Sequence, residues 1–221
     1  MNKTILIHQA KIINENKTYR GSVLIKNNLI DKIFKEEVPE KTLKNAEIID
    51  ASDKILIPGV IDTHVHFREP GLEHKGDIYS ESKAAIAGGV TSFIDMPNTD
   101  PQTITLDLLE EKCHIAAKKS LANYSFYLGA TNSNIEEVKK ADPQKVPALK
   151  LFMGASTGNM LVEEKEKLDT IFSLSPLLIA THNEDGAIIS KNIKKYKEQF
   201  DKDEIPIAYH SLIRSADACF N

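Results

Sequence analysis

The stretch that decides the fold is PGVIDTHVH, residues 58–66, where the rhythm of the chain changes. A β-branched apolar run ends there in polar residues, a pattern that indicates a strand followed by a loop carrying side-chain chemistry. From this point strands and helices alternate five times along the chain. Such alternation predicts a parallel sheet whose strands are connected by crossover helices.

Periodicity places the elements of this second part of the chain. Helix 106–120 is the clearest, because its apolar side chains recur on one face and its charges occupy the other. The members of that apolar face are Leu106, Leu109, Cys113, Ala116 and Ala117. The other helices are expected at 77–89, 135–141, 161–175 and 186–200, and the strands near 59–66, 90–96, 124–130, 148–153 and 177–182.

Two closures suit alternating units of this kind, a doubly wound open sheet and a TIM-like (β/α)8 barrel. The barrel is favoured because polar residues gather at the carboxyl ends of several different strands, where barrel enzymes carry their sites. No glycine-rich phosphate loop follows the first strand, as a dinucleotide-binding sheet requires. The part after Pro58 is shorter than the roughly 200 residues of a small barrel. We therefore expect an incomplete barrel of about five βα units and a truncated chain.

The first part of the chain reads differently. Short β-branched runs separated by turn signals predict an antiparallel meander, followed by two more short strands within 46–58. We expect residues 1–55 to form part of a small β-sandwich module and residues 56–221 to form the barrel part. The meander strands are expected at 4–8, 11–14, 21–26 and 29–34.

Composition excludes several classes of function. The 221 residues carry a net charge of -4, with 28 basic and 32 acidic residues and no basic stripe, so nucleic-acid binding has no electrostatic support. No apolar run approaches the roughly 20 residues that span a bilayer, and the N-terminus has no signal-peptide pattern. Two distant cysteines, Cys113 and Cys219, indicate reduced thiols, although a disulfide between them stays open. We expect a cytoplasmic protein.

His64 and His66 form the sharpest chemical signal. Residues i and i+2 of a strand point to the same face, so two imidazoles can bind one metal ion such as Zn²⁺. The alternative is one hydrogen-bonded and one solvated histidine. Lys150 stands within the apolar strand ALKLFM, where an unpaired ammonium is costly. It could be a neutral amine converted to a carbamate that bridges two metals, or a lysine on a solvated side.

Three more polar residues follow strand ends. His182 ends PLLIATH and could hold a second metal or cap the next helix. Arg68, two residues past His66, offers a planar fork suited to a carboxylate, or a surface salt bridge. Asn98 in DMPNT could bind the same carboxylate with its amide, or serve as a turn residue. Candidate metal ligands occur at three strand ends, and together they support a metal site more strongly than any one of them does alone.

At these residues the chain resembles a known family. GVIDTHVHFREPG, AGGVTSFIDMPNT, ALKLFMGASTGNM and THNED are similar to the amidohydrolase superfamily, and most of all to class I dihydroorotases. HFREPG and MPNT are the more specific segments. Hydantoinases and dihydropyrimidinases share the H-x-H strand without that arginine context, whereas allantoinases are similar around DTHVH and GGVT.

The resemblance implies a mechanism. His64 and His66 would hold the first of two Zn²⁺ ions, carboxylated Lys150 would bridge the pair, and His182 would bind the second. Some relatives use an aspartate as the bridge. Arg68 and Asn98 would bind the carboxylate of dihydroorotate or carbamoyl-aspartate, which a reversible ring closure interconverts in pyrimidine synthesis. The metal-binding aspartate that acts as general acid and base would lie beyond Asn221, as would another histidine, so no residue of this catalytic role is within the chain.

That implied function has alternatives. The chain could belong to an allantoinase or another cyclic amidohydrolase, or to a non-catalytic relative that binds aspartate transcarbamoylase. The resemblance also leaves open a homo-oligomer. Every ligand position that the chain reaches is filled, which favours the enzyme, and we expect the 221-residue piece to be inactive alone.

Overall fold

The computed structural model describes residues 3–154, 159–200 and 204–220. The chain divides into two compact units, Met1–Gly59 and Val60–Asn221, and each is described by itself. Residues 155–158 of the motif ALKLFMGASTGNM lie outside the described residues, as does Asn221. Within the described ranges, no helix is both long and apolar enough to cross a membrane.

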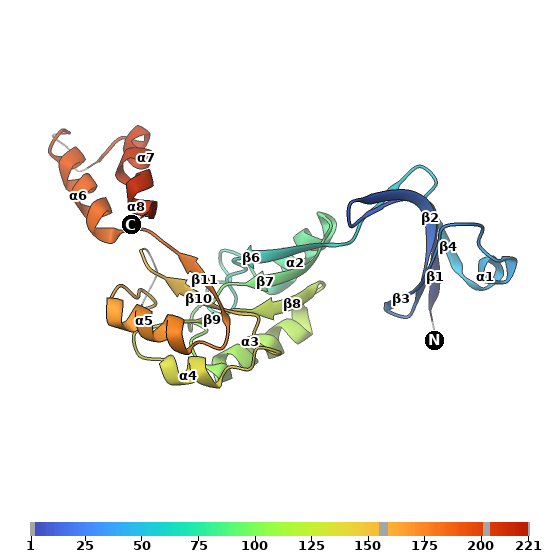
Figure 1. Cartoon of the computed structure of the whole chain (residues 1–221), viewed down its shortest axis with the longest axis horizontal. Helices are drawn as coiled ribbons and strands as arrows, with labels where there is room; N and C mark the ends of the chain where they lie inside the picture. The colour runs from blue at the N-terminus through green and yellow to red at the C-terminus, as the bar shows by residue number, and fades with distance from the viewer. Residues whose placement is uncertain (1–2, 155–158, 201–203, 221) are drawn as a thin grey trace. The chain divides into compact units, whose positions relative to one another are not determined.

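The first unit is built on a five-stranded sheet with the order β3-β2-β1-β4, in which β5 also pairs with β1 (Figure 1). The predicted strands 4–8 and 11–14 are in fact one strand, β1. Its register shifts between Ile7 and Ala10, where Gln9 has a φ of 61°. A bulge of this kind bends a strand without ending it. The bounds are β1 Thr4–Asn14, β2 Lys17–Lys26, β3 Leu29–Phe34, α1 Glu40–Asn45, β4 Glu47–Asp50 and β5 Ile55–Leu56.

The antiparallel meander extends over β1, β2 and β3, whereas β4 and β5 run parallel to β1. Buried side chains lie in two clusters, one around Leu6 and Leu24 and the other around Ala10 and Val23. The described residues of this unit form one sheet, so the β-sandwich stays a prediction.

The second unit carries parallel strands that follow one another in chain order, which confirms the parallel α/β prediction. The predicted third strand, 124–130, divides at Tyr127. Its first part, β8, pairs with β7, and its second part, β9, pairs with β10. The described residues of this unit therefore form two three-stranded sheets, β6-β7-β8 and β9-β10-β11. The bounds are β6 Val60–Val65, β7 Val90–Asp95, β8 Asn123–Phe126, β9 Leu128–Gly129, β10 Ala148–Phe152 and β11 Leu178–His182.

Strands β6 and β11 stand at the outer ends of this order among the described residues. Both expose apolar side chains there: Ile61 of β6 is 64% exposed and Leu178 of β11 is 75% exposed. The inner strand β10 is the opposite case, because all five of its residues are buried.

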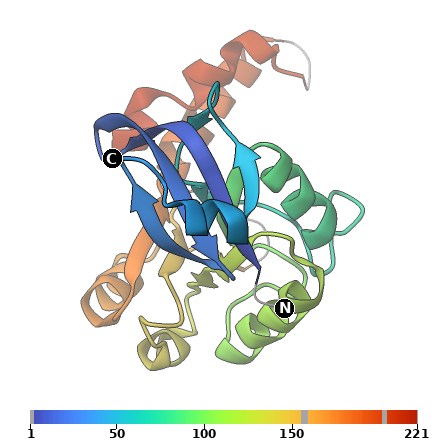
Figure 2. The same cartoon turned by 90° about the vertical axis from the view of Figure 1, so that its right-hand side faces the viewer.

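Helices follow the strands, and α3, α4 and α5 lie on one side of them (Figure 1; Figure 2 gives the view turned by 90°). Helix α2 begins at a capping box, in which the Asp77 carboxylate accepts a hydrogen bond from the Ser80 amide at 2.8 Å. The helix bounds are α2 Ile78–Ala87, α3 Leu106–Lys119, α4 Ile135–Lys140, α5 Lys165–Leu174, α6 Gly186–Lys197, α7 His210–Ile213 and α8 Ala216–Phe220, with a 3₁₀ turn η1 at Ile207–Tyr209.

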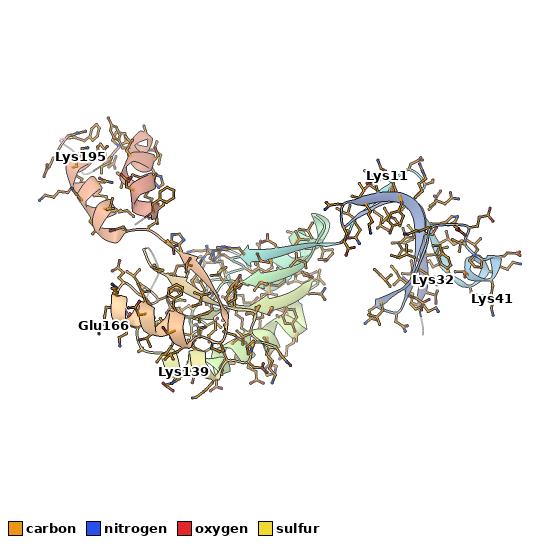
Figure 3. All side chains as sticks on the ribbon, in the orientation of Figure 1. Lys11, Lys32, Lys41, Lys139, Glu166 and Lys195 are labelled. Carbon is orange, nitrogen blue, oxygen red and sulfur yellow. The ribbon has the colours of Figure 1, made fainter. Side chains whose placement is uncertain are left out.

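The expected faces of α3 need one correction. Leu109 and Ala116 are buried as predicted, but Ala117 is exposed and Lys112 is buried in its place. Of the charged residues labelled in Figure 3, Lys139 of α4, Glu166 of α5 and Lys195 of α6 are exposed. Cys113 and Cys219 are both free thiols.

The contrast between β10 and β11 gives a first prediction. Leu149→Ala should lower the free energy of unfolding by about 2–5 kcal/mol, because the side chain is fully buried and its loss leaves a cavity. Leu178→Ala on the neighbouring strand should change it by less than about 0.5 kcal/mol. Urea denaturation followed by circular dichroism measures both. Equal effects of the two substitutions would contradict the buried position of β10.

Candidate metal centre

The two histidines of β6 lie together, as their spacing predicts. His64 is in the strand and His66 is the first residue past its end. Their ring centroids are 5.4 Å apart and both side chains are exposed. Although the side chains are exposed, the part of each ring that is shielded from water lowers the pKa of both imidazoles, which favours the neutral form that binds metal ions.

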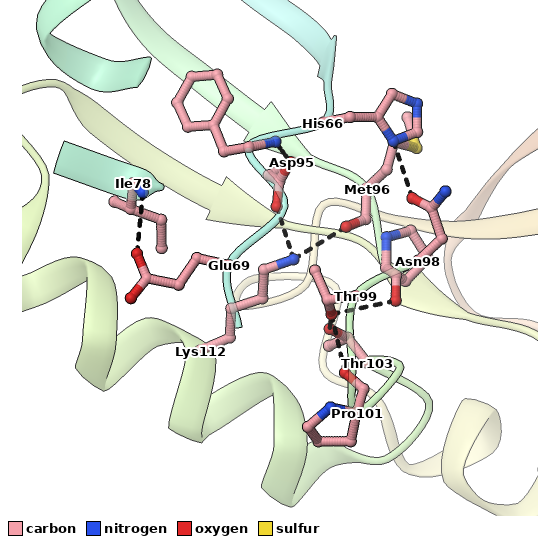
Figure 4. A network of polar contacts seen from close by, with 12 residues as sticks. His66, Glu69, Ile78, Asp95, Met96, Asn98, Thr99, Pro101, Thr103 and Lys112 are labelled. Atoms are coloured by element: carbon pink, nitrogen blue, oxygen red, sulfur yellow. Dashed lines mark hydrogen bonds and ion pairs between the residues drawn. The ribbon is translucent and has the colours of Figure 1, made fainter. Parts of the chain in front are cut away.

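Asn98 orients the second of these rings. His66 Nδ1 and Asn98 Oδ1 are 2.8 Å apart, as Figure 4 shows, and an amide oxygen can only accept, so Nδ1 is the donor. This hydrogen bond favours the Nδ1–H tautomer and leaves Nε2 with its lone pair. It also raises the pKa of His66 against the effect of burial. Metal-binding imidazoles are commonly oriented by such a bond on the other nitrogen.

Lys150 is buried, which decides against a position on the solvated side of its strand. It is the third residue of β10 and only 2% exposed, with its Nζ 4.9 Å from the centroid of the Phe152 ring. Burial lowers the pKa of its amine. The charge of Lys150 in turn lowers the pKa of His64, as does that of His182, so these residues are close enough to interact.

His182 is the last residue of β11, directly opposite Phe152 of β10. Its Nε2 lies 3.1 Å from a carboxylate oxygen of Glu184. The same oxygen pairs with the guanidinium of Arg214, beyond α7. Burial raises the pKa of Glu184, but the bonds from Arg214 and His182 outweigh it and hold the pKa below its usual value. The contact leaves Nδ1 of His182 as the ring nitrogen that Glu184 does not engage.

Arg68 sits in a left-handed backbone conformation, with a φ of 71°. Within the described part of the chain, its guanidinium makes no hydrogen bond and no ion pair. Its charge lowers the pKa of His66, after the effects of burial and Asn98. Among the described residues, the guanidinium therefore remains available for an anionic partner.

The structure thus places the rings of His64 and His66 beside one another, and Asn98 in hydrogen-bond contact with His66. Lys150, His182 and Arg68 are related to these histidines through their charges. In residues 3–154, 159–200 and 204–220 no group of three or more His, Cys, Asp or Glu side chains is arranged to hold a metal ion. The donor set nevertheless fits a metal in its chemistry, because it pairs neutral imidazoles with a buried amine that desolvation favours as neutral.

Some polar residues near the site were missed by the sequence analysis. Glu184 is one, and the buried pair of Asp95 and Lys112 is another, with nitrogen and oxygen 2.6 Å apart. One signal for Lys112 was available, since it follows Leu109 by three residues and so falls on the apolar face of the helix. Nothing in the sequence pattern pointed to Asp95 as its partner.

Residues 55–217 match the family described as the amidohydrolase family, and the chain belongs to this family. It is 33% identical over 218 residues to the dihydroorotase of Methanosarcina mazei, covering 97% of this chain and 46% of that protein. It is 32% identical to the dihydroorotase of Thermococcus kodakarensis, covering 87% of this chain and 44% of that one. The chain spans about half the length of these relatives.

Among solved structures, the L-hydantoinase of Arthrobacter aurescens is similar with a TM-score of 0.87 and 25% identity, covering 99% of this chain and 48% of that one. A D-hydantoinase is similar with a TM-score of 0.76 and 28% identity, covering 97% of this chain and 47% of that one. Both agree with the family assignment.

The bond between Asn98 and His66 gives a second prediction. Asn98→Ala should lower the pKa of His66, because the hydrogen bond that raises it is lost while the burial that lowers it largely remains. Asn98→Asp is the matched control and should raise the pKa, since it keeps an acceptor and adds a negative charge. Proton–nitrogen NMR of the imidazole, recorded against pH with a chelator present, measures both. A shift of the same sign in the two variants would refute the assigned contact.

Proposed function

We propose that the chain is the N-terminal part of a dihydroorotase, which reversibly closes carbamoyl-aspartate into dihydroorotate. The observation that carries the proposal is Arg68, two residues past the H-x-H pair, in a chain whose relatives by sequence are dihydroorotases. The similar solved structures include hydantoinases, so similarity of fold alone does not decide which cyclic substrate the protein binds. A carboxylate beside the ring is what a free guanidinium at this place would recognise.

In this proposal His64, His66, Lys150 and His182 would hold two Zn²⁺ ions, with carboxylated Lys150 as the ligand shared between them. Bound zinc would polarise the ring amide carbonyl and supply a hydroxide near neutral pH. The burial of Lys150 supports its role, because a neutral amine is the form that reacts with carbon dioxide. The lowered pKa values of His64 and His66 support theirs, because protonated imidazole cannot bind a metal.

Asn98 has two compatible tasks here. Its Oδ1 accepts from His66, which leaves the two N–H groups of its amide free to donate in another direction. Arg68 would form a two-pronged bond with the substrate carboxylate, and the Asn98 amide would add a further donor. Together they would fix the ring relative to the zinc-binding imidazoles.

The proposed active protein is the whole one, about twice the length of this chain if it matches its relatives. We place the aspartate that moves the proton in that further portion, so the 221 residues alone should be inactive. The chain-order strands support a (β/α)8 barrel begun by residues 56–221, with residues 1–55 in a separate β module. A cytoplasmic location goes with this metabolic role.

The test of the proposal is an assay of the whole protein with dihydroorotate and with allantoin. We expect hydrolysis of dihydroorotate and far slower turnover of allantoin. A preference for allantoin would replace the proposal with an allantoinase. Absence of activity toward both, with metal bound, would favour a non-catalytic partner of aspartate transcarbamoylase.

Arg68 provides a third prediction. In the whole protein, Arg68→Lys should lower kcat/KM for dihydroorotate by about 10- to 100-fold, because lysine keeps the charge but loses the planar fork. Zinc content should stay unchanged. Steady-state kinetics and metal analysis of the same samples measure both. Arg20→Lys, at an exposed arginine of the first unit, is the matched control and should have no effect. Unchanged kinetics in Arg68→Lys would remove the support for carboxylate recognition.

A further inference from the structure

A buried ion pair lies directly behind the candidate site. The Lys112 ammonium of α3 and the Asp95 carboxylate at the end of β7 are 2.6 Å apart, and each side chain is 1% exposed. Figure 4 shows the pair between the helix and the ends of the strands. Burial lowers the pKa of Lys112, and the charge of Asp95 opposes that shift.

The carboxylate holds the chain that leaves the H-x-H strand. Asp95 Oδ1 accepts a hydrogen bond of 2.8 Å from the amide of Phe67, the residue directly after His66. One residue past the end of β7, the Met96 amide donates to the carbonyl of Val65 at 3.0 Å. His66 is thus fastened to the end of β7 through the residues on both sides of it.

The ammonium of Lys112 holds the segment that leads from β7 to Asn98. Lys112 Nζ donates to the carbonyl of Met96 at 2.9 Å, two residues before Asn98. The ammonium also lies 5.0 Å from the centroid of the Phe126 ring, at the end of β8. Both partners of the hydrogen bond between His66 and Asn98 therefore belong to segments that the ion pair fixes.

Stability alone does not account for such a pair. Removing two charges from water is expensive, and apolar residues of similar size often replace a buried ion pair without loss of stability. What apolar residues cannot supply is the pair's directed bonds, which run to Phe67 and Met96. Phe67 directly follows His66, and Met96 lies two residues before Asn98.

We infer that Asp95 and Lys112 are positioning residues, which set the place of His66 and Asn98 without touching substrate or metal. Its relevance to catalysis rests on the proposed function of this site. It goes beyond that site in assigning a role to a strand–helix pair that lies outside the ligand set. Partners behind a metal ligand typically change metal affinity by about 10- to 100-fold when they are lost.

Two double variants of the 221-residue chain separate the roles. Asp95→Leu with Lys112→Met removes the charges and the bond to Phe67. Asp95→Asn with Lys112→Met removes the charges but keeps an acceptor for Phe67. Glu136→Gln with Lys139→Met removes an exposed ion pair of α4, at 2.9 Å, and serves as the control.

The first measurement needs no metal. Nitrogen-15 NMR of the His66 ring, at a pH where it is neutral, reports the tautomer, and His66→Gln identifies its signals. We expect the Nδ1–H form in the wild type and in the control. It should be lost with Asp95→Leu and Lys112→Met, at an unchanged thermal midpoint of unfolding, and partly kept with Asp95→Asn and Lys112→Met. A wild-type tautomer in a folded Asp95→Leu, Lys112→Met protein would overturn the inference.

The second measurement is titration calorimetry with zinc chloride. We expect affinity to fall by about 10- to 100-fold with Asp95→Leu and Lys112→Met. If the wild-type chain binds no zinc, the proposed metal site loses its support, while the tautomer still decides the positioning role. If Asp95→Leu with Lys112→Met does not fold, the decision passes to Asp95→Asn with Lys112→Met, where a wild-type tautomer would overturn the inference and a mixed one would support it.

Discussion

Parallel pairing is the constraint on which the rest of the second unit depends. Strands β6, β7 and β8 run parallel to one another, as do β9, β10 and β11, and β9 continues the chain from β8, so their carboxyl ends face the same way. Residues within or just past the carboxyl halves of these strands then lie toward a common edge. The imidazoles, the buried amine and the amide of the candidate site come from separate stretches of sequence and are related only through this alignment.

The same constraint explains why the site needs support from behind. A strand end is held on one side by its neighbours in the sheet, but the residue just past it has no ladder of its own. Here a carboxylate at the end of β7 supplies the missing acceptor for the chain beyond β6, and a helix supplies the countercharge. The polar interior and the exposed site are thus parts of one arrangement.

Much of this could be predicted from periodicity, because it is local information. The same-face placement of His64 and His66 follows from a period of two, and the burial of Lys150 follows from its apolar neighbours. Long-range pairing could not be predicted in this way. Lys112 was assigned to the solvated face because charges usually occupy it, and its partner lies 17 residues earlier on another element. Likewise, the division of the third strand at Tyr127 arises from pairing with two different neighbours.

The outer strands of the second unit carry a consequence of their own. Backbone N–H and C=O groups along a free strand edge have no partner in the sheet and can pair with another chain. Exposed apolar side chains beside them strengthen such pairing. Parallel strands in particular are seldom stable without cover on both faces. Among the described residues, β6 and β11 have no further strand on their outer sides, and Ile61 and Leu178 expose apolar side chains there. At high concentration, therefore, we expect these exposed strand edges to favour self-association through added strands.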